Sequence, residues 1–266
     1  MTTQTQSDHR LQDAPTATVE KDDHVAIITM QNPPNNVLTA ELRRELLAIL
    51  AGLEADTDVR AVVIASNQAN YTAGGDLKED QSLSDEEVRQ YVSDFSEVID
   101  RIDEFRVPVI AAIGGGAFGG GLEFVLACDF RIASTEAFFV ASGVNVGLIV
   151  SFWRLPRIVG LGPAKEILLT GTRYNAEQAL NWGLVTEVHP PEKLREAAIA
   201  KARRIASRAP LSVELTKIST NEALDLTGPE GSELQMQRFI KMFRTRDHKE
   251  ALDAFFERRK ANFERR

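Results

Sequence analysis

The stretch IGGGAFGGGLE, residues 113–123, decides the fold and points to the kind of chemistry. It follows the apolar run Val109 to Ile113, which predicts a buried strand, and it leads into an apolar helix. Glycines at this density let the backbone approach a ligand closely and leave N–H groups at the start of the helix unpaired. Such donors, backed by the helix dipole, stabilise developing negative charge. Tight packing of the strand on the helix is the purely structural alternative.

Another glycine turn occurs earlier in the chain. Residues 71–78, YTAGGDLK, follow another apolar strand that spans Val59 to Ala65. Two such turns, each after a buried parallel strand, can each place one N–H at a common point. That construction is an oxyanion hole, in which main-chain donors bind an oxygen that gains negative charge.

The same glycines also fit a dinucleotide-binding motif. Gly114, Gly116 and Gly119 match G-x-G-x-x-G, the turn from strand to helix found in nicotinamide and flavin enzymes. Glu136 falls near the position that binds a ribose, but no clear strand ends just before it. A dinucleotide-dependent oxidoreductase is therefore a rival hypothesis, and the glycines that continue past the motif count against it.

The order of the predicted elements indicates an α/β protein. Strand, helix and strand alternate up to residue 65, and the pattern is mostly helical from Pro163 onward. A capping box of Ser84 and Glu87 opens a helix that ends before Pro108. We divide the chain into a disordered tail at 1–16, a core at 17–200 and a charged helical region at 201–266.

Composition and charge exclude several classes of function. The net charge is −8, from 31 Lys and Arg against 39 Asp and Glu, so the chain is a poor general binder of nucleic acid, whose phosphates need clustered cations. The four histidines have no metal-ligand spacing, so we expect no metal site. Cys128, the one cysteine, lies in an apolar run and is interpreted as a small buried side chain.

Membrane insertion and export are not expected. The longest apolar stretch, Val109 to Cys128, contains six glycines and Glu123, which argues against a membrane span. Residues 1–16 are polar and lack the pattern of a signal peptide. We therefore expect a cytoplasmic protein.

At its two glycine turns the sequence resembles the crotonase superfamily, the enoyl-CoA hydratase/isomerase family. Tyr71 to Leu77 fits the family pattern of an aromatic residue, two small residues, then Gly-x-Asp-Leu. Pro108 to Asp129 fits the most recognisable stretch of the family. Further similar segments are Asn145-x-Gly147, Leu169 to Gly171, Ala176 to Val185 and Lys260 to Phe263, so the resemblance extends over most of the chain.

The resemblance implies a superhelix of ββα turns with an all-helical C-terminal trimerisation region. It also implies an acyl-CoA thioester as substrate and a homotrimer, or a hexamer built as a dimer of trimers. No separate cofactor is implied, because coenzyme A enters as part of the substrate.

The resemblance assigns roles residue by residue. It places oxyanion donors at the backbone N–H groups of Ala73 and Gly120, and a catalytic carboxylate at Glu123. In the family, the C-terminal positions often contact the CoA of a neighbouring subunit. The implied CoA-binding residues are Asn36, Val37, Leu38, Asp76, Leu77, Lys260 and Phe263.

The sequence departs from the hydratases where they carry a second catalytic Glu. Gly143 occupies that position, and the turn that follows is replaced by the apolar segment LIVSFW at 148–153. Either Glu123 alone handles the protons, or neutral groups such as Ser142, Asn145 or Ser151 place a water molecule there. The predicted acyl pocket comprises Ser142, Asn145, Phe152 and Trp153.

A single carboxylate restricts the reaction. Hydration of an enoyl thioester needs a group that activates water and a group that protonates the α-carbon, so Glu123 would do both. Isomerisation needs one base, and decarboxylation of a malonyl-type thioester needs none to start. We expect a hydratase- or isomerase-type lyase that stabilises a thioester enolate. Decarboxylation, acyl-CoA binding without turnover, and a merely salt-bridged Glu123 are the alternatives.

Overall fold

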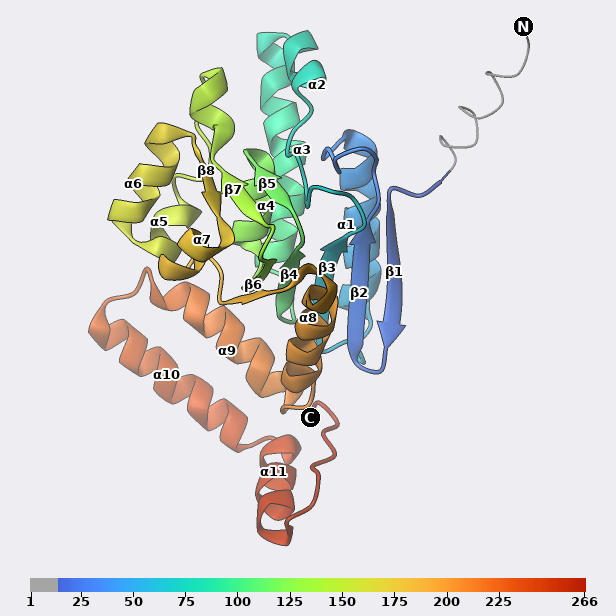
Figure 1. The fold of residues 1–266 in the computed structure, drawn as a ribbon. Coiled ribbons are helices and arrows are strands. Elements are labelled where there is room, and N and C mark those ends of the chain that lie inside the picture. Colours follow the sequence, from blue (N-terminus) through green and yellow to red (C-terminus); the bar gives the residue numbers. More distant parts are fainter. Residues whose placement is uncertain (1–13) are drawn as a thin grey trace, which may run out of the picture.

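The computed structural model describes residues 14–266 (Figure 1). The predicted disordered tail, residues 1–16, lies outside the described residues except for its last three. Of these, Thr16 is buried, and its hydroxyl donates a hydrogen bond to Glu45 at 2.7 Å. The chain is therefore packed against the core from Thr16 onward.

A six-stranded sheet forms the centre of the protein. Its first two strands are antiparallel, and every later pair of neighbours is parallel. The carboxyl ends of the parallel strands therefore meet at one edge, where α/β proteins bind their ligands. The strand order is β1 (Ala17–Asp22), β2 (Val25–Met30), β3 (Ala61–Ser66), β4 (Val109–Ile113), β6 (Phe130–Ser134) and β9 (Glu187–His189).

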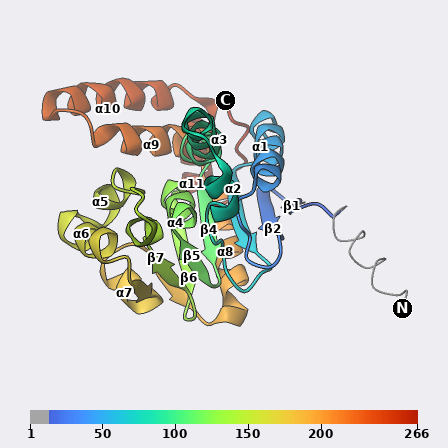
Figure 2. The same ribbon diagram turned by 90° about the horizontal axis from the view of Figure 1, so that it is seen from above.

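Helices cover both faces of this sheet (Figure 2). Alternate residues of each central strand point to opposite faces. In β3, Val62 and Ile64 pack with α1 (Ala40–Ala55) and α3 (Asp85–Asp103), whereas Val63 packs with α8 (Pro191–Ala206). Burial of both faces explains why β3 and β4 are continuous apolar runs, as the sequence predicts.

The glycine stretch contains a strand that the sequence analysis missed. β5 (Gly116–Phe118) belongs to a second, three-stranded sheet with β7 (Phe138–Val140) and β8 (Arg173–Asn175). Glycine is depleted in strands, so composition gave no signal for β5. The chain thus leaves the large sheet after β4 and forms β5 before α4 (Gly120–Ala127) begins. A dinucleotide-binding unit passes directly from strand to helix, so this arrangement differs from the rival hypothesis.

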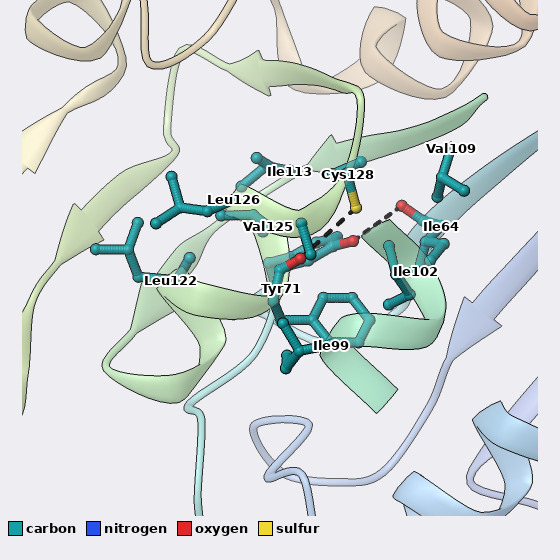
Figure 3. Packing of buried hydrophobic residues seen from close by; sticks show 14 of the residues in the cluster. Ile64, Tyr71, Ile99, Ile102, Val109, Ile113, Leu122, Val125, Leu126 and Cys128 are labelled. Carbon is teal, nitrogen blue, oxygen red and sulfur yellow. Dashed lines mark hydrogen bonds between the residues drawn. The ribbon is translucent and has the colours of Figure 1, made fainter. Parts of the chain in front are cut away.

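The side chain of Tyr71 anchors the glycine turn at residues 71–76 in the core (Figure 3). It is fully buried, and its hydroxyl donates to the Ile64 carbonyl at 3.2 Å, at the end of β3. Its ring lies 6.3 Å from that of Phe124 in α4, centroid to centroid. Burial raises the pKa of Tyr71 well above its usual value, so the phenol stays protonated as a donor.

The C-terminal third is helical, as predicted, apart from the short strands β8 and β9. The predicted core boundary at residue 200 falls inside α8, which packs on the large sheet as one helix. In Figure 1, α9 and α10 extend away from the sheet as an antiparallel pair. Within residues 14–266, every helix is too short or too polar to span a bilayer. The remaining helices are α2 (Leu77–Ser82), a 3₁₀ turn at Ser142–Val146, α5 (Arg154–Val159), α6 (Leu161–Thr170), α7 (Ala176–Asn181), α9 (Pro210–Ala223), α10 (Gly228–Phe243) and α11 (Arg246–Glu257).

A buried ion pair connects α9 to the sheet. The Lys217 ammonium donates to the Asp129 carboxylate at 2.8 Å, and the same carboxylate oxygen accepts the Val109 N–H at 2.7 Å. The Lys217 side chain is only 4% exposed. Burial raises the pKa of Asp129, although the Lys217 charge opposes that shift. A buried carboxylate of this kind depends on its partner.

We predict that Lys217→Met lowers the free energy of unfolding by about 3–5 kcal/mol, because it leaves the Asp129 charge buried without a partner. Urea denaturation measures the change. The double variant Lys217→Met/Asp129→Asn is the control, and it should lose less than Lys217→Met alone. A loss below about 1 kcal/mol in the single variant would contradict the prediction.

Candidate active site

The two glycine turns lie against each other. We call residues 71–76 the first glycine turn and residues 114–121 the second. The Thr72 N–H donates to the Gly116 carbonyl and the Phe118 N–H donates to the Thr72 carbonyl, both at 3.2 Å. A Cβ atom on Gly74, where φ is +84°, would lie 2.5 Å from the Phe118 carbonyl oxygen. Main chain therefore touches main chain here, and only glycine fits at position 74.

Among the amides of these turns that lack an acceptor within residues 14–266 are those of Gly75 and Gly120. The hydrogen bonds of residues 14–266 include none from either amide. The nitrogen of Gly75 lies 3.4 Å from the position that a Cβ on Gly120 would take, so the two amides are close neighbours. Two adjacent N–H groups without acceptors can form an oxyanion hole.

The predicted donor Ala73 needs correction. Its N–H already donates to the Asn35 carbonyl at 3.0 Å, and the next amide, at Gly74, donates to the Thr72 hydroxyl at 3.1 Å. Neither is available to a ligand in this structure. The predicted Ala73 amide is therefore occupied, whereas those of Gly75 and Gly120 have no acceptor within residues 14–266.

Glu123 lies on the same side of α4 as Gly120. The two residues are three positions apart at the start of the helix, which places them about 5–6 Å from each other along one face. The Glu123 side chain is 18% exposed. Its Oε1 atom accepts a hydrogen bond from Arg154 at 2.6 Å, whereas its Oε2 atom is buried and has no partner within residues 14–266. Glu123 is thus salt-bridged and still has one oxygen free.

Arg154, at the start of α5, was not identified from the sequence. Its second guanidinium nitrogen donates to Asp100 at 2.9 Å and to Asp103 at 3.2 Å, both in α3. Burial lowers the pKa of Arg154, but the hydrogen bond and charge of Glu123, with the α3 carboxylates, outweigh it and raise the pKa. The contact joins residues 31 positions apart, and no local pattern marks it.

Two aromatic side chains of α3 lie beside Gly75 and Gly120. A Cβ on Gly75 would lie 2.8 Å from the Tyr91 hydroxyl, and one on Gly120 would lie 2.5 Å from the Phe95 ring. The Arg43 guanidinium lies 5.3 Å from the Tyr91 ring centroid. Burial, together with Asp80, raises the pKa of Tyr91.

Comparison with known proteins identifies the family. The model of the enoyl-CoA hydratase/isomerase family matches residues 20–266. The chain belongs to this family. It is 38% identical to a probable enoyl-CoA hydratase of Rhizobium meliloti, over 94% of this chain and 98% of that protein. It is 35% identical to a crotonyl-CoA hydratase of Syntrophomonas wolfei, over 92% and 96%.

Solved structures agree with this assignment. The crystal structure of an enoyl-CoA hydratase from Bacillus anthracis superposes with a TM-score of 0.91 at 34% identity, over 94% of this chain and 100% of that one. The predicted crotonase fold is therefore confirmed, and the chain is an enzyme of the hydratase and lyase class.

The residues implied to bind CoA near the first glycine turn lie together. Asn36 is buried and donates to the Tyr71 carbonyl at 3.1 Å, and the Leu38 N–H donates to the Gly74 carbonyl at 2.8 Å. Val37, between them, pairs with Gly74. Asp76 caps α2 by accepting from the Lys78 N–H, and Leu77 is exposed. These residues brace the turn and border the site.

Lys260 and Phe263 lie at the opposite edge of the large sheet. The Phe263 carbonyl accepts from Arg60 at 3.0 Å, just before β3 begins. Lys260 and Phe263 line a cavity of about 310 Å³ there with His24, at the start of β2. Within one chain they are therefore separated from the first glycine turn by the length of the strands.

The residues expected in the acyl pocket do not form one group. Only Ser142 borders the glycine turns, with its hydroxyl 2.8 Å from where a Cβ on Gly119 would lie. Asn145 donates to the Gly171 carbonyl at 2.9 Å, and Phe152 is 66% exposed. The Trp153 ring centroid lies 4.2 Å from the Arg157 guanidinium, and Trp153 lines a cavity of about 700 Å³ beside α9 that Arg154 also lines.

Gly143 lies buried in the 3₁₀ turn. A Cβ at this position would be 2.9 Å from both the Leu148 carbonyl oxygen and a methyl group of Val150. The backbone around position 143 therefore leaves little room for a side chain.

We predict that Gly74→Ala destabilises the protein by about 2–4 kcal/mol, through its positive φ and the clash with the Phe118 carbonyl. Gly183→Ala is the matched control, since Gly183 has a similar φ of +74° and nothing within 4 Å of its Cβ position. Thermal unfolding compares the two. Equal losses would show that the turns are not in tight contact.

Proposed function

We propose that this enzyme adds water to the double bond of a 2-enoyl-CoA thioester. In this proposal the amides of Gly75 and Gly120 bind the thioester oxygen, and Glu123 handles the protons. The observation that supports it best is the pair of adjacent free amides with a carboxylate one helical turn away. The names of the relatives agree with this reaction class.

The oxyanion hole supplies much of the catalysis. When water attacks the β-carbon, the electron pair of the double bond moves through the α-carbon to the thioester oxygen, forming an enolate. Hydrogen bonds from Gly75 and Gly120 would strengthen as this charge develops, and one such donor contributes about 3–4 kcal/mol. The two aromatic side chains of α3 border the same point and help to exclude water from it.

Glu123 carries both proton transfers in this proposal. Its ionised carboxylate accepts a proton from the attacking water, and the same proton then goes to the α-carbon as the enolate collapses. Because the proton taken from water is the one delivered to the α-carbon, the reaction needs no second carboxylate. Gly143 stands where the hydratases carry one, and the Ser142 hydroxyl beside it is the neutral group best placed to orient the water.

Isomerisation is the second candidate reaction. Moving a proton between the α- and γ-carbons needs one base and the same enolate stabilisation. The single carboxylate beside the glycine turns favours this reaction as well. Assays with crotonyl-CoA, a 3-enoyl-CoA and methylmalonyl-CoA distinguish hydration and isomerisation from decarboxylation of a malonyl-type thioester and from binding without turnover.

We also propose that the enzyme works as a homotrimer or as a dimer of trimers. The CoA-binding residues of the tail lie at the far edge of their own sheet, so a neighbouring subunit would have to supply them to each site. Large apolar side chains are exposed on the C-terminal helices, as expected of an uncovered interface. They are Met236, Phe239, Ile240, Phe243, Leu252, Phe255 and Phe256.

We predict that Glu123→Gln lowers kcat for crotonyl-CoA hydration at least 10³-fold, because the amide accepts no proton from water. Binding of butyryl-CoA, measured by calorimetry, should change less than threefold. Glu136→Gln is the control, since Glu136 is exposed and its carboxylate makes no hydrogen bond or ion pair within residues 14–266. Full activity of Glu123→Gln on crotonyl-CoA, a 3-enoyl-CoA and methylmalonyl-CoA would refute the role of Glu123.

We predict that Gly143→Glu does not raise the hydration rate, although it restores the carboxylate found in hydratases. The new side chain would collide with the backbone at Leu148, so the variant should instead lose stability by about 1–3 kcal/mol. Steady-state kinetics and thermal unfolding test this. A faster hydratase of normal stability would show that position 143 is open.

A further inference from the structure

We propose that Arg154 is a positioning residue for Glu123: it holds one carboxylate oxygen and leaves the other to work on the substrate. This inference rests on the proposed function, in which Glu123 transfers protons. It assigns a role in the reaction to a residue of α5 that contacts the catalytic side chain directly.

The two oxygens of Glu123 have different surroundings. Oε1 is held by the Arg154 guanidinium at 2.6 Å. Oε2 is buried and lacks any partner within residues 14–266. A buried carboxylate oxygen without a hydrogen bond is costly, so a bound water or substrate group is the natural partner for Oε2. The ion pair therefore fixes which oxygen meets the reacting atoms.

The guanidinium is itself fixed from the other side. Its second nitrogen donates to Asp100 and Asp103, which are three positions apart on α3. One planar group thus bridges α3, α4 and α5 and sets the orientation of the Glu123 side chain. Lysine could not reproduce this, because its ammonium is a point charge without the fork of donors.

The same helix carries the aromatic side chains that lie beside Gly75 and Gly120. Tyr91 and Phe95 lie on α3, ahead of Asp100 and Asp103 in the chain. Arg154 therefore connects the carboxylate to the helix that lies beside Gly75 and Gly120. Loss of this bridge would displace Glu123 relative to the bound thioester, and a displacement near 1 Å costs on the order of 10²-fold in rate.

The positive charge of Arg154 is its second contribution to the site. Three carboxylates surround Arg154, and its side chain is only 15% exposed. The guanidinium offsets the mutual repulsion of these three carboxylates. Without Arg154, Glu123 would face Asp100 and Asp103 with no cation between them.

The test compares Arg154→Met with Arg154→Lys, Glu123→Gln and the double variant Glu123→Gln/Arg154→Met. Arg157→Met is the matched control, since Arg157 lies on the same helix, contacts Trp153 and pairs with Asp225, but not with Glu123. The measurements are kcat and KM for crotonyl-CoA and calorimetric affinity for butyryl-CoA, which has no double bond to hydrate.

We expect Arg154→Met to lower kcat about 10²-fold while the affinity for butyryl-CoA stays within threefold of wild type. Arg154→Lys should recover part of the loss, and Arg157→Met should stay within twofold of wild type. In the Glu123→Gln background, Arg154→Met should cause no further loss beyond twofold, because there is no carboxylate left to position.

Two results would overturn the inference while leaving the proposed function intact. One is a kcat for Arg154→Met within threefold of wild type. The other is a full second loss in the double variant, which would indicate a structural role independent of Glu123. If Arg154→Met does not fold, the test rests on Arg154→Lys. A kcat of Arg154→Lys equal to that of wild type would then refute the positioning role of Arg154. Wild-type protein without turnover would overturn the proposed function, and this inference with it.

Discussion

The close contact between two glycine turns is the constraint on which the rest of the site depends. Thr72 exchanges main-chain hydrogen bonds with Gly116 and Phe118, so a turn after β3 and a turn after β4 are joined backbone to backbone. This joining requires glycine at position 74, and it leaves the amides of Gly75 and Gly120 adjacent and without acceptors. Tyr71 anchors the first turn to the core through the Ile64 carbonyl. The sheet thereby holds these two N–H groups in fixed positions.

The same contact explains the position of the carboxylate. Because α4 begins at the second turn, Glu123 is held one helical turn from the Gly120 amide. Arg154 then ties Glu123 to α3, whose aromatic side chains lie beside Gly75 and Gly120. The site is therefore assembled from three helices and two turns that are distant in the sequence. One carboxylate in this setting suffices for either hydration or isomerisation of an enoyl thioester.

Much of this arrangement could be predicted from the sequence, and the exceptions have physical reasons. Continuous apolar runs predicted β3 and β4, and the glycine spacing predicted both turns. β5 was missed because three residues of a glycine-rich stretch carry no strand signal. Ala73 was assigned in place of Gly75, since only the three-dimensional structure reveals that the Asn35 carbonyl occupies the Ala73 amide. Arg154 was missed because its contact with Glu123 is long-range, and Phe152 was expected inside a pocket but is exposed.

A crystal structure with butyryl-CoA bound tests the central claim most directly. The thioester oxygen should lie about 2.7–3.1 Å from the amide nitrogens of both Gly75 and Gly120. The Oε2 atom of Glu123 should face the α- and β-carbons. A thioester oxygen bound elsewhere, or held by the Ala73 amide after release from Asn35, would contradict the account.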